Sequence, residues 1–232
     1  MTQHPTARAQ TLVQTIQDDL GPVEAQLRQH AYFQDLDAGQ IASQQLRYFV
    51  GEQWYIIPSD LRSIALLISR CETPASQQFF RDVLQGEAAA LDALAPLAAA
   101  VGMSAADCEA YEPTPGAQAY SAYLAWLCLY GSVADVVTAL SVNFAAWGAN
   151  CGRMGQALQR QYGLPETAVR FFTQFATAPA DPSPAAMQLM EAGLQHAGAS
   201  RRMARAARML QGYELMFWDT IYALSTHSER PA

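Results

Sequence analysis

The chain has 232 residues, of which 51% are apolar and 15% are charged, and its formal net charge is −7. This acidic balance argues against a nucleic-acid backbone as the main partner, because affinity for phosphates needs clustered basic charge. All 14 basic residues are arginines, which excludes Schiff-base lysine chemistry and the lysine of a P-loop.

Good helix formers dominate the sequence, and the alternation of apolar and polar residues typical of strands is missing, which predicts an all-α fold. Pro58 interrupts a helical pattern over residues 42–70, so we expect a kink or a break there. The last helical stretch, over residues 184–225, is expected to be one rod or two helices that meet near Gly198. A single domain over residues 1–232 is the expected organisation. Glycine and proline clusters predict the other helix boundaries at Gly21-Pro22 and at residues 37–39, 72–74, 102–104, 113–116, 163–165 and 178–184.

The cysteines and the hydropathy pattern both point to the reducing interior of a cell. No CxxC pair occurs, and each cysteine lies within or beside an apolar helical run, so we expect reduced, buried thiols. The N-terminal sequence MTQHPTARAQTL has no apolar signal segment. No apolar run approaches the 18 residues of a membrane span. We therefore expect a cytoplasmic protein. The four cysteines are Cys71, Cys108, Cys128 and Cys151.

Polar residues interrupt the apolar seams of the predicted helices. On the last helix, steps of three and four residues join Leu210, Glu214, Phe217 and Ile221, so the carboxylate of Glu214 lies on the inward face. Burying polar groups without partners is costly, so these groups should meet one another, water or a ligand. Nearby aromatic residues would wall a flat ligand, although an internal network that only specifies the fold remains an alternative. The same spacing turns Gln53, Glu87, Tyr120 and Asn143 inward on other helices.

A metal site and a cysteine nucleophile are not expected. The Glu-x-x-His pairs of carboxylate-bridged di-iron bundles do not occur, and no histidine lies three or four residues from an inward carboxylate. Cys151 lies one turn beyond Trp147, but it has no evident histidine partner, so we interpret it as a structural thiol.

The order of several motifs resembles that of TenA-like (thiaminase-II-like) proteins. Residues 213–222, YELMFWDTIY, are similar to the closing YExxFWxxAY helix of that family. Residues 30–50 resemble its HPF…DGxL…F..Y opening, and residues 113–120 resemble its PxP…Y segment. The resemblance covers nearly the whole chain and implies a haem-oxygenase-like multi-helical bundle, assembled as a homodimer or homotetramer.

The resemblance also implies a site, which in the family binds an aminopyrimidine of thiamin salvage between aromatic walls. Glu214 matches the family's catalytic acid/base. The family's nucleophilic cysteine falls at Asn143, and its pyrimidine-holding aspartate falls at Gln53, so both groups are lost here. The candidate ligand-binding residues are Gln53, Tyr55, Glu87, Tyr120, Asn143, Trp147, Tyr213 and Phe217.

Three functions are compatible with these residues. The first is cysteine-independent hydrolysis of a C–N bond, related to aminopyrimidine aminohydrolase and thiaminase II, with Glu214 as acid/base. The second is a catalytically silent protein that binds another small planar heteroaromatic ligand, and neither of these two needs a cofactor. The third is haem binding, with His30 as axial ligand and a glycine-rich helix at Gly148, Gly152 and Gly155.

Overall fold

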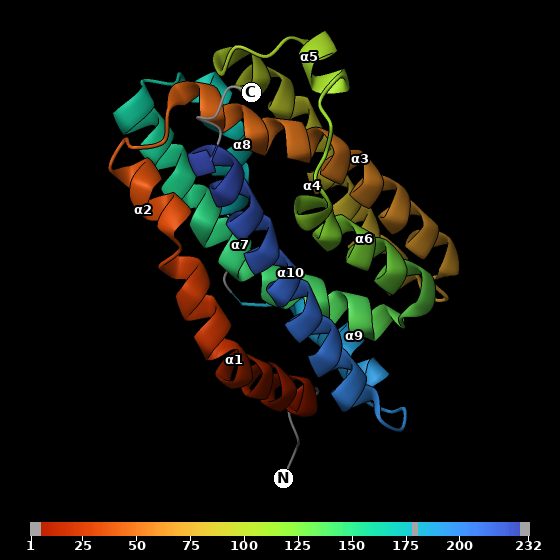
Figure 1. Cartoon of the computed structure of the whole chain (residues 1–232). Coiled ribbons are helices and arrows are strands. Elements are labelled where there is room, and N and C mark those ends of the chain that lie inside the picture. Colours follow the sequence, from red (N-terminus) through yellow and green to blue (C-terminus); the bar gives the residue numbers. More distant parts are fainter. Residues whose placement is uncertain (1–5, 178–180, 228–232) are drawn as a thin grey trace.

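The computed structural model describes residues 6–177 and 181–227 (Figure 1). Within these ranges every regular element is helical, which confirms the predicted all-α fold. None of the described helices combines the length and apolarity needed to cross a bilayer. The elements are α1 (Ala7–Arg28), α2 (Ala31–Asp37), the 3-10 helix η1 (Ser43–Leu46), α3 (Arg47–Arg70), α4 (Pro74–Ala100), α5 (Ala105–Glu109), α6 (Pro115–Tyr130), α7 (Val133–Tyr162), α8 (Glu166–Ala176), α9 (Pro184–Gly193) and α10 (Ala199–His227).

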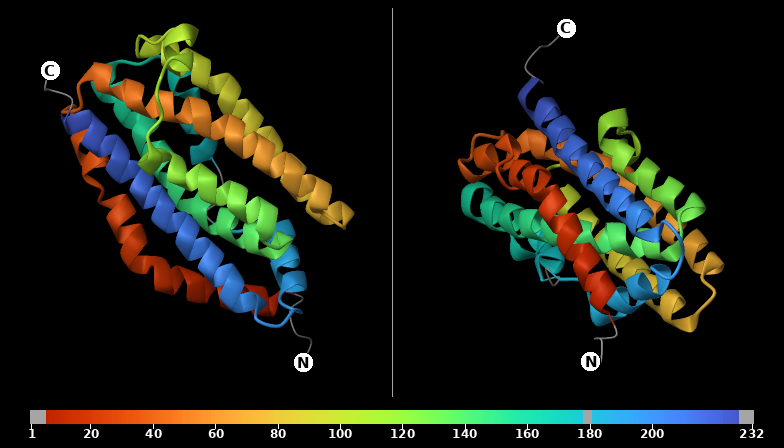
Figure 2. Two further views of the ribbon diagram at one scale, coloured as in Figure 1. Left: turned by 45° about the vertical axis from the view of Figure 1, so that its right-hand side comes forward. Right: turned by 90° about the horizontal axis from the view of Figure 1, so that it is seen from below.

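The predicted helix boundary at Gly21-Pro22 is wrong, and of the kink or break expected at Pro58 the break does not occur. Helix α1 continues through Gly21-Pro22, and α3 continues through Pro58. A proline removes one backbone hydrogen bond and pushes on the preceding turn, which a long, well-packed helix accommodates by bending. Figure 2 shows such a bend in α1. The separation of α9 from α10 confirms the two-helix alternative, and Gly198 adopts a left-handed φ of 70° between them. The predicted boundary at 178–184 lies between α8 and α9, although residues 178–180 are outside the described part.

Hydroxyl side chains begin several of these helices. Thr73 Oγ1 accepts a hydrogen bond from the Ser76 amide at 3.2 Å, and Ser132 Oγ accepts one from the Asp135 amide at 3.2 Å. Each bond satisfies a backbone donor that has no partner inside the helix. These caps explain why α4 and α7 start directly after short polar turns.

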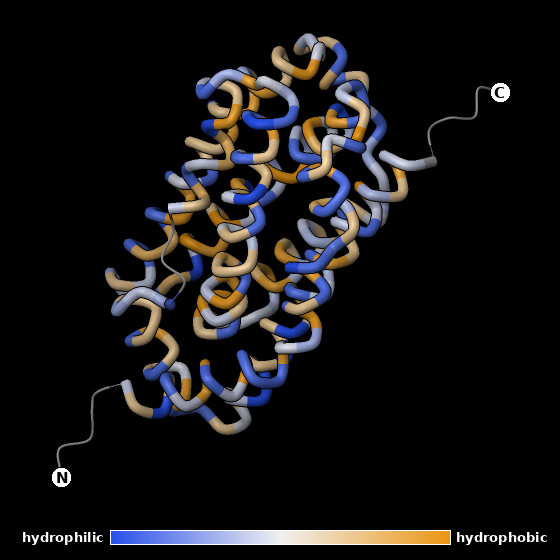
Figure 3. Tube along the Cα trace, turned by 90° about the vertical axis from the view of Figure 1, so that its left-hand side faces the viewer, coloured by the Kyte–Doolittle hydropathy of each residue, from blue (hydrophilic) through white to orange (hydrophobic). Residues whose placement is uncertain are grey.

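Six helices form a closed ring in the order α3, α4, α8, α7, α10 and α6, since each packs against the next and α6 packs against α3. Figure 2 shows α10 running between α1 and α6, and α1 and α2 cover the outer side of α7 and α10. The tube in Figure 3 alternates between hydrophilic and hydrophobic colours along each helix, as expected for amphipathic helices around a shared interior.

Two apolar clusters fill the interior, and polar side chains lie between them. On α10, Leu210 belongs to one cluster and Phe217 to the other, with Glu214 between. On α7, Leu140 and Met154 are divided in the same way by Asn143. The polar interruptions of separate seams thus lie in one layer of the molecule. The four cysteines are buried and free, as predicted.

Candidate ligand-binding pocket

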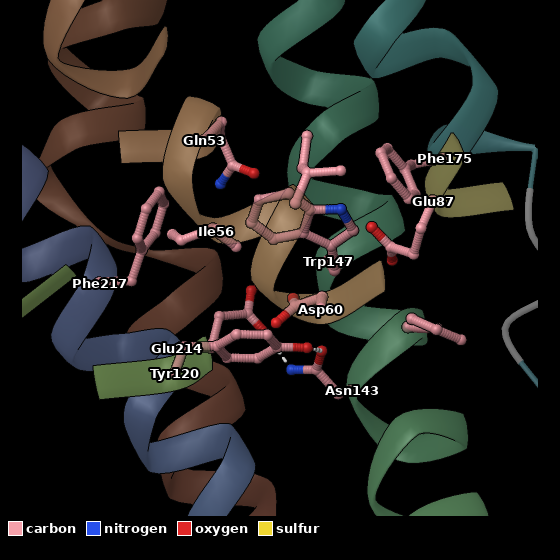
Figure 4. Close-up of a pocket in the computed structure, with 12 residues that line it drawn as sticks. Gln53, Ile56, Asp60, Glu87, Tyr120, Asn143, Trp147, Phe175, Glu214 and Phe217 are labelled. Atoms are coloured by element: carbon pink, nitrogen blue, oxygen red, sulfur yellow. Dashed lines mark hydrogen bonds between the residues drawn. The ribbon is translucent and has the colours of Figure 1, made fainter. Parts of the chain in front are cut away.

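A pocket with a cavity volume of about 40 Å³ lies within this polar layer (Figure 4). Each of the six ring helices contributes to its wall. The lining residues are Gln53, Ile56, Ile57, Asp60, Glu87, Tyr120, Asn143, Phe144, Trp147, Phe175, Glu214 and Phe217. The five polar residues predicted to face inward therefore all line one pocket.

A chain of hydrogen bonds joins three of these residues across three helices. The Tyr120 hydroxyl donates to Asn143 Oδ1 at 2.9 Å. The Asn143 amide donates to Glu214 Oε2 at 2.6 Å and to Gln211 Oε1 at 3.3 Å. With both ends of its amide engaged, Asn143 has one orientation, and α6, α7 and α10 are held together at the level of the pocket.

Glu214 is a buried carboxyl group that lines the pocket. Its side chain is only 1% exposed, and the indole nitrogen of Trp218 donates to Oε1 at 3.2 Å. Burial raises the pKa of Glu214 to about 7, against the opposing effect of the donors on Trp218 and Asn143. A carboxyl group with this pKa takes up and releases a proton near neutral pH, as general acid–base catalysis requires.

Aromatic rings wall the pocket on two sides. Trp147 and Phe217 pack edge to face with their ring centroids 6.1 Å apart, and Phe175 packs against the other side of Trp147 at 5.9 Å. Trp218 lies behind this wall, stacked on Trp147 at 5.6 Å. The indole of Trp218 thus holds both Glu214 and Trp147 in place without lining the pocket.

Two predicted site residues lie outside the pocket. The Tyr55 hydroxyl donates to the backbone oxygen of Glu109 at 2.8 Å, which turns its ring away from Gln53. The Tyr213 ring packs against Tyr123 at 5.1 Å between centroids. The reason is helical geometry, because neighbours one or two residues from an inward position point about 100° or 200° away from it.

Asp60 is a pocket residue that the sequence analysis missed. It is 4% exposed and accepts a hydrogen bond from Ser121 Oγ at 2.7 Å. A signal for it existed, since Asp60 lies two turns after Gln53 and three residues after Ile57, on the same face of α3. No sequence pattern indicates that Phe144 and Phe175 line the pocket, because their place in the wall depends on how α7 and α8 approach α4.

Haem ligation by His30 does not fit this arrangement. His30 Nδ1 accepts from the Tyr32 amide at 3.2 Å, and Nε2 pairs with Asp219 Oδ1 at 3.0 Å, so both ring nitrogens are engaged in capping α2 and joining it to α10. The glycine-rich part of α7 faces α8 instead of an open cleft. A Cβ on Gly148 would lie 2.8 Å from the Phe175 oxygen.

Cysteine chemistry has no support at the pocket. Cys151 is buried with 0% exposure and does not line the cavity. Burial raises the pKa of its thiol well above the ordinary value, which disfavours the nucleophilic thiolate.

Comparison with known proteins identifies the fold and the family. The family model described as TENA/THI-4/PQQC matches residues 17–224. A search of curated protein sequences finds no significant match.

Solved structures share the architecture at low identity. A TenA homologue from Pseudomonas syringae pv. tomato has a TM-score of 0.78 and 14% identity, with 90% of this chain and 91% of that chain covered. A TenA homologue from P. horikoshii has a TM-score of 0.73 and 14% identity, with 92% and 99% covered. A domain of unknown function with a heme oxygenase-like fold from Shewanella denitrificans has a TM-score of 0.77 and 13% identity, with 94% and 97% covered.

Proposed function

Because the chain belongs to the TENA/THI-4/PQQC family, we propose that its central pocket binds an aminopyrimidine of the thiamin-salvage type and hydrolyses an exocyclic C–N bond. The observation that carries this proposal is the position of Glu214. Its carboxyl group faces a pocket with aromatic walls, and its pKa of about 7 suits proton transfer at neutral pH.

The proposed reaction needs one water molecule and one acid/base group. Glu214 as carboxylate takes a proton from water, and the water oxygen forms a bond to the carbon while the C–N bond breaks. The proton then passes from Glu214 to the departing nitrogen, which leaves as ammonia or an amine. Asn143 has no part in bond making, because an amide is a poor nucleophile; its hydrogen bond holds the carboxyl group in position.

The size of the cavity sets a condition for binding. A volume of about 40 Å³ holds a few water molecules at most, so a six-membered ring requires the wall to open. The side chains of Phe144, Phe175 and Glu87 separate the pocket from an outer groove of about 430 Å³, because they line both. We propose that a ligand enters from this groove by displacing the two phenylalanine rings.

A catalytically silent binding protein is the second candidate function. The observation that favours it is the closed network at Asn143, where an amide occupies the nucleophile's position and engages Glu214 and Tyr120 at the same time. In that case the pocket would bind a planar ligand without catalysing its conversion.

The substitution Glu214→Gln tests the hydrolase. With 4-amino-5-aminomethyl-2-methylpyrimidine as substrate, we expect the native protein to release ammonia and the variant to be slower by about 100-fold or more, because the amide cannot transfer a proton. The exposed Asp92 on α4 supplies a matched control, and Asp92→Asn should keep the native rate.

Thermal shift separates the two candidate functions. A ligand that binds only the folded state raises the melting temperature. A rise without turnover would favour the silent binder, whereas neither a rise nor turnover across a panel of aminopyrimidines would contradict both candidates.

A further inference from the structure

Two carboxyl groups face the pocket without a basic partner. Asp60 on α3 and Glu87 on α4 both line it, whereas no arginine or histidine does. In the part of the chain that the structure describes, neither group belongs to an ion pair. Asp60 accepts one hydrogen bond, from Ser121, and no described residue donates one to Glu87.

Another buried carboxylate shows how this chain satisfies a structural acid. Glu52 is 0% exposed and accepts hydrogen bonds from the Tyr111 hydroxyl, the Thr114 amide and hydroxyl, and the Gln118 amide, at 2.7–3.0 Å. Such a cage compensates for the cost of burial. Asp60 and Glu87 have no comparable cage; Asp60 is buried, whereas Glu87 is half-buried and also lines the outer groove. A cation in the pocket would therefore find two carboxyl groups that have no other ionic partner among the described residues.

The pKa values show that neither carboxyl group is stabilised in its ionised form by the protein alone. Burial raises the pKa of Asp60 well above its ordinary value, and the neighbouring Glu87 raises it further. Burial also raises the pKa of Glu87 to about 7. A cation bound beside them would stabilise both ionised forms.

Gln53 is a second and independent sign of a ligand at the same place. Its side chain is 4% exposed and lines the pocket, yet its amide has no hydrogen-bond partner among the described residues. Figure 4 shows the amide directed into the space between Phe217 and Trp147. The amide faces the pocket space, so water or a ligand bound there is expected to supply its hydrogen bonds.

The wall favours a flat organic cation over a metal ion. Among the described residues, no three His, Cys, Asp or Glu side chains are grouped as metal ligands would be. Trp147 and Phe217 both line the cavity, and aromatic rings attract delocalised cations.

We propose that the pocket selects a planar ligand that carries an amidinium or ammonium group, and that Asp60 and Glu87 hold this group. The inference rests on the proposed function for the location of the ligand and specifies its charge. Gln53 then hydrogen-bonds the uncharged edge of the ring. The positive charge is thus recognised by Asp60, two turns after Gln53 on α3, and by Glu87 on α4, and not at position 53, where the TenA-like resemblance implied an aspartate.

Three isosteric probes test the charge requirement. Benzamidine is a planar cation at neutral pH, benzamide is its neutral counterpart and benzoate is its anionic counterpart. In calorimetric titrations of the native protein, we expect measurable affinity for benzamidine alone. Equal affinity for benzamidine and benzamide, or no affinity for benzamidine, would overturn the inference.

Isosteric variants test the two carboxyl groups. We expect Asp60→Asn and Glu87→Gln each to weaken benzamidine binding by about tenfold, since each removes a charge-assisted hydrogen bond. Asp92→Asn, an exposed change on the same helix as Glu87, should bind like the native protein. Circular dichroism checks that each variant folds. If Asp60→Asn does not fold, the affinity of Glu87→Gln for benzamidine still tests the inference. Unchanged affinity in a folded variant would contradict the role of that residue.

The outcomes separate this inference from the proposed function. Charge-dependent benzamidine binding without turnover of aminopyrimidines would leave the inference standing and contradict the hydrolase. Turnover of aminopyrimidines that is insensitive to both Asp60→Asn and Glu87→Gln would support the hydrolase and overturn the inference.

Discussion

At the scale of single residues, Asn143 is the junction on which the site depends. Its amide accepts from Tyr120 and donates to Glu214 and Gln211, so one side chain orients the acid and the phenol together. A thiol at this position would offer one weak donor and no second acceptor of comparable strength. Asparagine at this position therefore acts by positioning two other side chains.

Removing this amide should change the acidity of Glu214. The hydrogen bond from Asn143 lowers the pKa of Glu214, which burial raises to about 7, so Asn143→Ala should move that pKa upward. NMR titration of a ¹³C-labelled Glu214 carboxyl group measures the change. We also expect a loss of about 1–3 kcal/mol in the free energy of unfolding, because Tyr120 and Glu214 lose a partner.

The neighbouring substitution Ser141→Ala is the control for this titration. Ser141 lies two residues away on α7 and does not line the pocket. An identical Glu214 titration in native and Asn143→Ala proteins would show that the hydrogen bond does not tune this acid.

At the scale of helices, close approach of α7 and α8 builds the aromatic wall. Gly148 lies on α7 against the last turns of α8, where a side chain would meet the backbone oxygen of Phe175 at 2.8 Å. The absence of a Cβ at this position lets Phe175 reach Trp147. The glycine is thus explained by helix packing, without a ligand that needs a glycine-rich surface.

Gly148→Ala should therefore destabilise the fold, by about 1–3 kcal/mol, because backbone atoms of α8 must shift. The matched control is Gly212→Ala on α10, where a Cβ meets nothing within 4 Å and better helix propensity should stabilise by about 0.5–1 kcal/mol. Urea unfolding of both variants measures the two effects. Equal stabilisation by both substitutions would contradict the close approach.

At the scale of the whole molecule, a polar layer between two apolar clusters is costly to keep. Glu214 is 1% exposed, and its pKa is raised from an ordinary 4.5 to about 7. The folded chain therefore binds more protons than the unfolded chain between these pH values. The contribution of protonated Glu214 to the free energy of unfolding is fully present below pH 4.5, and it is lost as the pH rises through about 7.

We expect Glu214→Gln to become progressively more stable than the native protein as the pH rises from 5 to 8. The difference should grow by no more than about 1.4 kcal/mol per pH unit, since one proton is involved. Urea denaturation at a series of pH values measures it. Asp92→Asn should show no such trend, and a constant difference for Glu214→Gln would mean that its carboxyl group is not destabilised by burial.

The sequence by itself determined the helical class, most helix ends, the family resemblance and the five polar residues that face inward. These properties follow from local rules: side-chain direction repeats with the helical period, and capping residues act within one turn. The same rule places Asp60 on the pocket face of α3, two turns after Gln53, and turns Tyr55 and Tyr213 away from the pocket, although both lie beside motif residues.

Only the tertiary structure decided that the inward polar residues meet in one layer. Periodicity gives the direction of a side chain about its own helix axis, but not the height at which two helices pack or the partner that each face meets. Those depend on contacts between distant segments, such as Asn143 with Glu214 and Asp60 with Ser121. For the same reason, only the assembled ring shows that Glu52 accepts four hydrogen bonds while Asp60, Glu87 and Gln53 face a small internal cavity.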